Sequence, residues 1–195
     1  MPQRLANEVL LKDLVQSATL FRKAAGVYHS LAIEVLPHFQ HVLPSERPPE
    51  ATLNVSSVMS LICLAEAQAE AKGITGSLLA KLHFGIVQIL DEASSTLHFA
   101  NKDKKDISTG FLEFVSTCKA VHELRSYKYL AENVRTDSQI GFALGVLQHV
   151  QITTQKIKLP SKESWRSVLK QEVKKIVNII PYQPLRWERP ISFKL

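Results

Sequence analysis

The sequence predicts an all-α protein, built as an antiparallel array of helices. Apolar residues recur every three or four positions along six segments of the 195-residue chain, as they do on one face of a helix. No segment alternates apolar and polar residues convincingly, as a half-buried strand would. The 7 glycines and 9 prolines cluster between the apolar segments, and short connectors after the second, third and fourth helices favour side-by-side neighbours. The expected helices span residues 5–36, 56–71, 77–100, 107–134, 137–155 and 162–179.

The first helix is long and amphipathic, and we expect Pro37 to end it, because proline lacks the N–H that a helix interior needs. Gly26 either weakens its middle or lets a neighbouring helix approach closely. The apolar stripe is Leu10, Leu14, Ala18, Phe21, Ala25, Tyr28, Leu31 and Val35.

The second and third helices meet at a glycine turn. We expect Ser56 or Ser57 to cap the second helix, since a serine hydroxyl accepts from the free amides of the first turn. Gly73 and Gly76 break the pattern, and either Thr75 or Ser77 caps the third helix. That helix carries a stripe of Leu78, Leu82, Ile86, Ile89, Ala93 and Leu97.

Three further helices complete the array. The apolar face of the fourth helix is Phe111, Phe114, Val115, Cys118, Val121 and Leu124, continued by Tyr127 and Leu130. The stretch from Thr136 to Gln139 has the capping-box pattern, so we expect the fifth helix to begin there. Pro160 and Ser161 mark the next stop and start, before a basic sixth helix. The segment 180–195 contains three prolines and is expected to be extended.

The positive charge is concentrated near the C-terminus. Of 24 Lys and Arg residues, ten lie in 156–195 against three Glu, a net charge of +7; the remaining 14 basic and 15 acidic residues give 1–155 a net charge of −1. A DNA-wrapping domain would spread its basic face over the fold. Aromatic residues also do not alternate with basic ones, as on an RNA-stacking face. We therefore expect no nucleic-acid partner.

The residues give no indication of catalysis, a cofactor or a metal. Walker, dinucleotide-binding, nucleophile-elbow and Glu-x-x-His patterns are all missing from the sequence. His38 and His41 lie between prolines without a nearby third ligand, and the other histidines fall singly on helices. Cys63 and Cys118 are expected to be reduced core thiols. We expect a non-enzyme that binds partners through a helical surface, since long helices present grooves for amphipathic helices.

Several motifs together resemble one known family. They are LAEAQA followed by SLLAKL, the long helix KDISTGFLEFVSTCKAVHELRSYKYLAE, the upstream KAAGVYHSLAIEVLP and the final IPYQPLRWERPISFKL. This combination resembles the Bro-one (BRO) domain family, the Alix-like domains of endosomal sorting, and especially its short single-domain members of the plant kind. The resemblance implies a curved, tetratricopeptide-like helical solenoid without enzymatic activity.

The resemblance also implies a partner. In the family, the concave face receives the C-terminal amphipathic helix of an ESCRT-III subunit and brings the protein to endosomes during multivesicular body transport. Two apolar residues of the family's docking patch map onto Leu78 and Leu82. They are four residues apart, so they lie one above the other on a helix. From the residues alone, both could equally be buried core.

The chain departs from the family in three places. It corresponds to about the C-terminal half of the domain, a partial BRO domain over residues 1–173 with residues 180–195 as its tail. Relatives place about seven more residues, two helical turns, before the glycine turn, and a third docking residue there has no counterpart here. Relatives also carry the rest of a long helix and an acidic linker between Val173 and Lys174. A truncated form with reduced or no binding is therefore an alternative expectation.

The expected location is the cytoplasm, with recruitment to endosomes. Charged residues interrupt any signal-peptide core at the N-terminus, and no apolar run approaches the ~20 residues that span a bilayer. A second alternative for function is peripheral binding to anionic membranes through the basic sixth helix and the tail, because Lys and Arg are attracted to anionic lipid.

Overall fold

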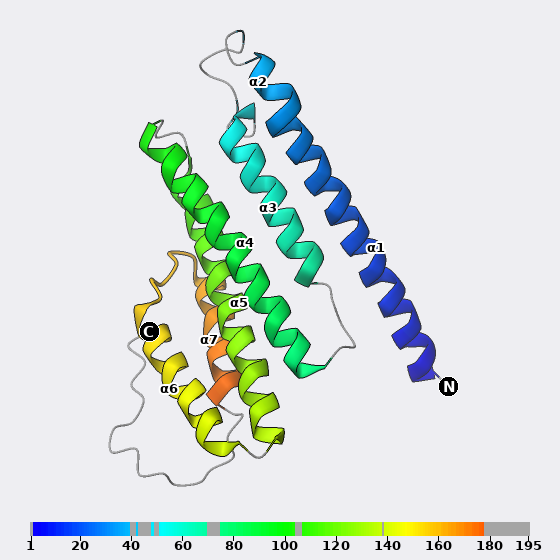
Figure 1. Ribbon diagram of the computed structural model, residues 1–195, viewed down its shortest axis with the longest axis vertical. Helices are drawn as coiled ribbons and strands as arrows, with labels where there is room; N and C mark the ends of the chain where they lie inside the picture. Colours follow the sequence, from blue (N-terminus) through cyan, green and yellow to red (C-terminus); the bar gives the residue numbers. More distant parts are fainter. Residues whose placement is uncertain are drawn as a thin grey trace. The chain divides into compact units, whose positions relative to one another are not determined.

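The computed structural model describes residues 2–39, 42, 48, 51–69, 75–103, 107–137 and 139–177, and over these the chain is all-α (Figure 1). The elements are α1 (Pro2–Ser30), a π-helical turn (Leu31–Val35), α2 (Leu36–Phe39), α3 (Leu53–Ala69), α4 (Gly76–Asp103), α5 (Thr109–Thr136), α6 (Ile140–Lys156) and α7 (Glu163–Val177). The all-α prediction is confirmed. The predicted solenoid arrangement stays a prediction, and the tail 180–195 lies outside the described residues.

The chain divides into two compact units. Unit 1 comprises Met1–Ile74 and Gly85–Lys119, and unit 2 comprises Thr75–Phe84 and Ala120–Leu195. The long helices α4 and α5 are each divided between the two units. The first turns of α4, up to Phe84, belong to unit 2 and the rest to unit 1, whereas α5 belongs to unit 1 up to Lys119 and to unit 2 from Ala120. The prediction of one partial BRO domain over 1–173 stays a prediction.

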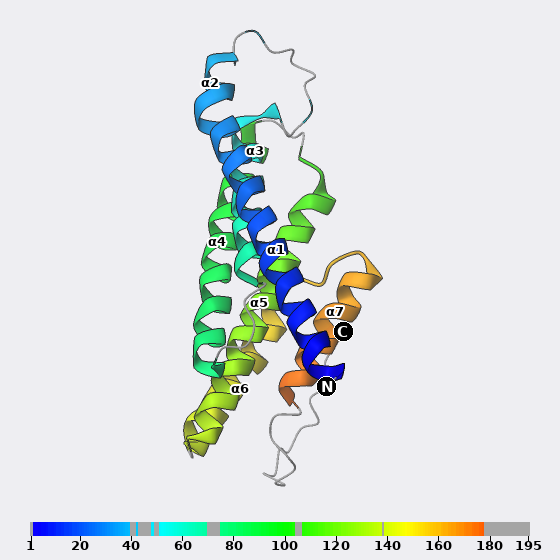
Figure 2. The ribbon, with the colours of Figure 1, turned by 90° about the vertical axis from the view of Figure 1, so that its right-hand side faces the viewer.

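In unit 1, α1 packs along α3, and the two helices lie side by side in both views (Figures 1 and 2). The buried residues Ala18 and Ala25 of α1 and Ala32 of the π-helical turn recur every seven positions, as in the seam between two long helices. The Ser60 hydroxyl of α3 donates a hydrogen bond of 2.9 Å to the Ala25 carbonyl oxygen. Small side chains thus hold the two backbones close. Gly26 takes no part, since nothing lies within 4 Å of where its Cβ would be.

The prediction that Pro37 ends the first helix is wrong. The chain stays helical to Phe39, after a π-helical turn in which the Leu36 N–H bonds to the Leu31 carbonyl, five residues back. The wider turn lies immediately before Pro37, whose ring would crowd the carbonyl groups of a regular helix. Leu36 is buried four positions after Ala32, whereas the predicted core residue Val35 is 43% exposed.

Helix α3 is buried on two sides. Its residues Val55, Val58, Ile62 and Ala65 join a core cluster with Ile86, Leu90, Ala93 and Leu97 of α4, together with Ile107 and Val115. A second buried stripe includes Ser56, Ser60 and Cys63. The prediction that Ser56 or Ser57 caps this helix is wrong, because α3 already begins at Leu53 and the Ser56 N–H bonds to the Thr52 carbonyl.

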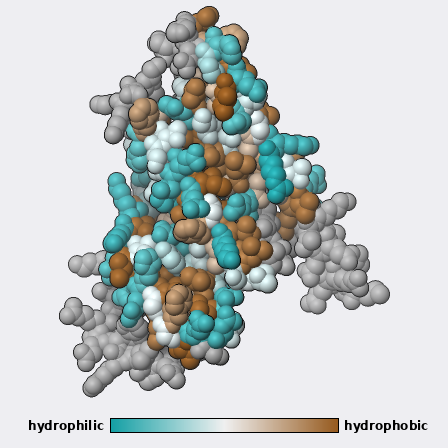
Figure 3. Space-filling view, viewed as in Figure 1, coloured by the Kyte–Doolittle hydropathy of each residue, from teal (hydrophilic) through white to brown (hydrophobic). Residues whose placement is uncertain are grey.

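Unit 2 has a core of its own, formed by three helices. The space-filling view shows apolar side chains reaching the surface among polar ones over the described part of the chain (Figure 3). The core contains Ala120, Val121, Leu124 and Ala131 of α5, Val146 and Val150 of α6, and Leu169 and Ile176 of α7.

The predicted capping box from Thr136 to Gln139 is wrong. Thr136 is the last residue of α5, its hydroxyl donates to the Asn133 carbonyl, and α6 begins only at Ile140, after Gln139 without a side-chain cap.

Candidate docking residues and a buried histidine pair

Thr75, one of the two residues predicted to cap this helix, lies directly before the first residue of α4. Its carbonyl accepts the Leu79 N–H at 2.9 Å, and its hydroxyl oxygen lies 3.4 Å from the Leu78 nitrogen as acceptor. Ser77 lies inside the helix. The cap places Leu78 in the first turn of α4.

Leu78 and Leu82 lie at the margin of the buried face of α4. Leu78 is 45% exposed, whereas Leu82 is half-buried and makes contacts of its own. The buried positions of the helix are Ala80, His83, Ile86, Leu90, Ala93 and Leu97. The predicted stripe is therefore right at Ile86, Ala93 and Leu97, which are buried, and at Ile89, which packs partly buried against the core cluster. Leu78 is not a core residue, so it is open to a partner.

Two neighbours of Leu78 complete an exposed row on α4. Lys81 is exposed, and Phe84 is 54% exposed. Successive steps of three residues place Leu78, Lys81 and Phe84 along one side of the helix. Phe84 was missed at the sequence level. Its signal is that a large aromatic residue falls outside the apolar stripe of its helix.

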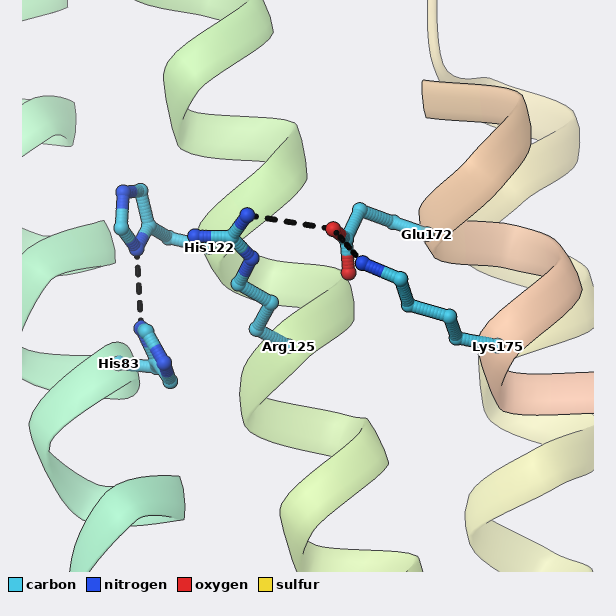
Figure 4. Close-up of polar contacts among 5 residues, drawn as sticks. All are labelled: His83, His122, Arg125, Glu172 and Lys175. Atoms are coloured by element: carbon cyan, nitrogen blue, oxygen red, sulfur yellow. Dashed lines mark hydrogen bonds and ion pairs between the residues drawn. The ribbon is translucent and has the colours of Figure 1, made fainter. Parts of the chain in front are cut away.

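A buried polar cluster lies inside unit 2, and one of its members, His83, directly precedes Phe84 in the chain. His83 of α4 and His122 of α5 are both buried, and their Nδ1 atoms are 2.9 Å apart (Figure 4). One Nδ1 must carry the proton that the other accepts, so the two rings are different tautomers when both are neutral. The Tyr129 ring stacks on His83 at 5.5 Å between centroids.

Burial keeps this pair neutral. Desolvation, followed by the charge of Arg125, lowers the pKa of His83 to about 4. Desolvation, followed by the neighbouring His83, lowers the pKa of His122 to about 3. Lys128 also opposes a proton on His83, while the Glu172 carboxylate favours one on either ring.

Glu172 connects α7 to α5. Its carboxylate accepts from Arg125 Nη2 at 3.2 Å and from Lys175 Nζ at 2.8 Å, and its side chain is 5% exposed. Burial alone would raise the pKa of Glu172, but the hydrogen bonds from Lys175 and Arg125 outweigh it and hold the pKa below its ordinary value. The predicted family departure beside Val173 therefore falls within a continuous, packed helix.

The described side chains do not assemble a metal site. No group of three or more His, Cys, Asp or Glu that could hold a metal occurs among them, and zinc needs three or four protein ligands. The cations beside the histidine pair also oppose a bound metal ion. His38 Nδ1 lies 2.7 Å from the Glu34 carbonyl oxygen in a local contact, and His41 is outside the described residues. Cys63 and Cys118 form no disulfide.

The geometry defines a helical protein with an exposed apolar and basic row on one helix. Comparison of the chain with models of protein families, with curated proteins and with solved structures finds no match. Over the described part of the chain, the helices are too short or too polar to cross a bilayer.

Proposed function

We propose that the protein is a non-catalytic adaptor that docks the C-terminal amphipathic helix of an ESCRT-III subunit in multivesicular body transport, as in the BRO domains its sequence resembles. The observation that carries the proposal is the exposure of Leu78, at a position that the resemblance assigns to docking. An exposed leucine beside a half-buried one gives a partner helix an apolar anchor.

The row around Leu78 favours a partner helix with apolar and acidic residues. Leu78 and Phe84 offer apolar surface, and Lys81 places a positive charge between them. Complementary charge at such a rim increases the association rate and selects the partner. Recruitment to endosomes would then follow from the partner rather than from a membrane anchor.

The test is binding of a synthetic ESCRT-III C-terminal helix, measured by fluorescence anisotropy. Leu78→Asp together with Leu82→Asp should abolish binding, and Leu78→Asp alone should weaken it about 10- to 100-fold, the effect of losing a hot-spot contact. Leu64→Asp is the matched control, since Leu64 is 41% exposed on α3 in unit 1. It should leave the affinity unchanged.

Circular dichroism accompanies each measurement, because Leu82 is half-buried and its replacement can unfold the helix. A folded wild-type chain that does not bind the peptide would refute the adaptor proposal, and is the result expected of a truncated form without binding. Equal loss of affinity in Leu64→Asp and Leu78→Asp would also count against docking on α4.

A second candidate function is peripheral binding to anionic membranes. Unit 2 contains 14 Lys and Arg against 6 Asp and Glu, whereas unit 1 contains 10 against 12. Each basic residue near anionic lipid contributes about 1 kcal/mol. Sedimentation with phosphatidylserine vesicles should then show binding at low salt that is lost at high salt and reduced by Lys174→Glu on the exposed side of α7. Vesicle binding that persists at high salt would contradict it.

A further inference from the structure

The buried imidazole and carboxyl groups are unevenly divided between the two units. Over the described side chains, the buried members of these classes are His83, His122 and Glu172, and all three belong to unit 2. The buried polar side chains of unit 1 are Ser56, Ser60 and Thr117, whose hydroxyl groups do not titrate in this range. Among the described side chains, the buried groups that mild acid can protonate therefore lie in unit 2.

The histidine pair resists protons for geometric reasons. With both rings neutral, one Nδ1–H donates to the other Nδ1 across 2.9 Å. A first proton leaves one ring charged inside the unit, and a second would set two N–H groups against each other at that distance. Two protons are therefore incompatible with the closed pair.

The charged groups around the pair do not relieve this restriction. Arg125 of α5 opposes a positive charge on either ring, and Lys128 of α5 opposes one on His83. Among the described residues, the carboxylate that favours such a charge is Glu172 of α7, which is already engaged by Arg125 and Lys175. Tyr129 offers its ring face to His83 rather than its hydroxyl. The rings gain water and protons only when the contact between α4 and α5 opens.

We propose that the His83–His122 pair is an acid-sensitive latch, which makes unit 2 open at mildly acidic pH while unit 1 stays closed. The latch joins the first turns of α4 to α5, where the Ser126 hydroxyl also donates to the Ala80 carbonyl at 2.9 Å. Leu78 and Leu82 belong to the same segment of unit 2. Acid would thus also weaken docking on α4, a consequence that rests on the proposed function.

The size of the effect can be worked out from proton linkage. An imidazole freed by opening titrates near pH 6.5, so its preference for the open state grows about 25-fold between pH 7 and pH 5. With two rings, the opening equilibrium of unit 2 should rise roughly 600-fold over this range.

The experiment is hydrogen exchange of the full chain at pH 7 and pH 5, read by mass spectrometry and corrected for the intrinsic pH dependence of amide exchange. Amides of α5 in unit 2 should lose protection by roughly 600-fold, whereas those of α3 in unit 1 should lose little. Parallel loss in the two units, or unchanged protection in unit 2, would overturn the proposal.

A variant separates the latch from other acid effects. The double change His83→Asn and His122→Asn replaces both rings by amides that can still bond to each other but do not titrate in this range. It should reduce the pH effect on unit 2 to less than about 3-fold. His98→Asn is the matched control, because His98 is exposed on the unit 1 part of α4, and it should leave the effect intact.

A second measurement on the wild-type protein covers the case in which the double variant does not fold. Imidazole NMR signals report the protonation of each ring directly. The latch requires both rings of the folded protein to stay neutral at pH 6. If either ring titrates near pH 6.5 while unit 2 keeps its amide protection, the proposal is wrong, irrespective of any result on peptide docking.

Discussion

Replacing Glu172 by glutamine tests whether α7 is held by a buried charge. The carboxylate is 5% exposed and accepts from Arg125 at 3.2 Å and Lys175 at 2.8 Å, while these partners are 35% and 52% exposed. Hydrogen bonds to charged groups contribute about 1.5–3 kcal/mol, but water screens both partners and glutamine keeps one acceptor. We expect Glu172→Gln to lower the free energy of unfolding by about 1–2 kcal/mol and the Tm by about 2–8 °C.

Glu163→Gln is the matched control, since it makes the same change on the same helix. Glu163 is 71% exposed and pairs with Arg166 three residues later at 3.3 Å, so its loss should cost less than about 0.5 kcal/mol. Urea denaturation at pH 7, monitored by circular dichroism, measures both variants. Equal stability losses in the two variants would refute the reasoning that burial gives the Glu172 contacts their strength.

The pH dependence separates Glu172 from the histidine pair. The pKa of Glu172 is lowered from its ordinary value of 4.5, so its contribution is present above pH 4.5 and is lost as the pH falls through the folded pKa. The stability difference between wild type and Glu172→Gln should stay constant from pH 7 to about 5.5 and shrink below about pH 4. A difference that grows with acid would contradict this assignment.

Three further predictions concern unit 1. Gly26→Ala should stabilise the protein by up to about 1 kcal/mol in thermal melts, because alanine favours the helix and its Cβ would have open space; destabilisation would indicate a close neighbour at this position. Ser60→Ala should cost about 1 kcal/mol in urea, since the hydroxyl bonds to the buried Ala25 carbonyl at 2.9 Å; an unchanged midpoint would count against that bond. Burial raises the pKa of the Cys63 thiol, so native alkylation at pH 8 should be slower at Cys63 than at half-buried Cys118, and the reverse order would contradict the assigned burial.

The helices were predictable because their signal is local. Apolar periodicity placed the segments 77–100 and 107–134 within a few residues of α4 and α5. The errors in helix capping occur where a hydroxyl has two possible roles. Ser56 and Thr136 are both residue types that favour the N-cap position. Ser56 is instead buried within α3, and the Thr136 hydroxyl donates to the Asn133 carbonyl at the end of α5. A threonine hydroxyl serves either end of a helix, so only the packing decides.

The site was less predictable, because side-chain burial depends on which face of α4 is covered. The pattern placed Leu78 and Leu82 on one stripe with Ile86, whereas packing covers Ala80 and His83 instead. The contact between His83 and His122 joins residues 39 positions apart. No sequence motif around either histidine therefore indicates that the two side chains meet. The available signal was the position of His83 three residues before the core residue Ile86, where a polar ring is unusual.

The exposure of Leu78 is explained by the contacts that hold the same turns of α4 in place. Ser126 bonds to the Ala80 carbonyl and His122 bonds to the His83 ring, so two contacts from α5 fix the rotation of this segment. Turning the helix far enough to bury Leu78 would break both contacts and leave buried polar groups without partners, at about 1–3 kcal/mol each. Leu78, Lys81 and Phe84 are therefore held outward by the polar interior of unit 2. The proposed docking row on α4 and the proposed acid-sensitive latch therefore depend on the same packing.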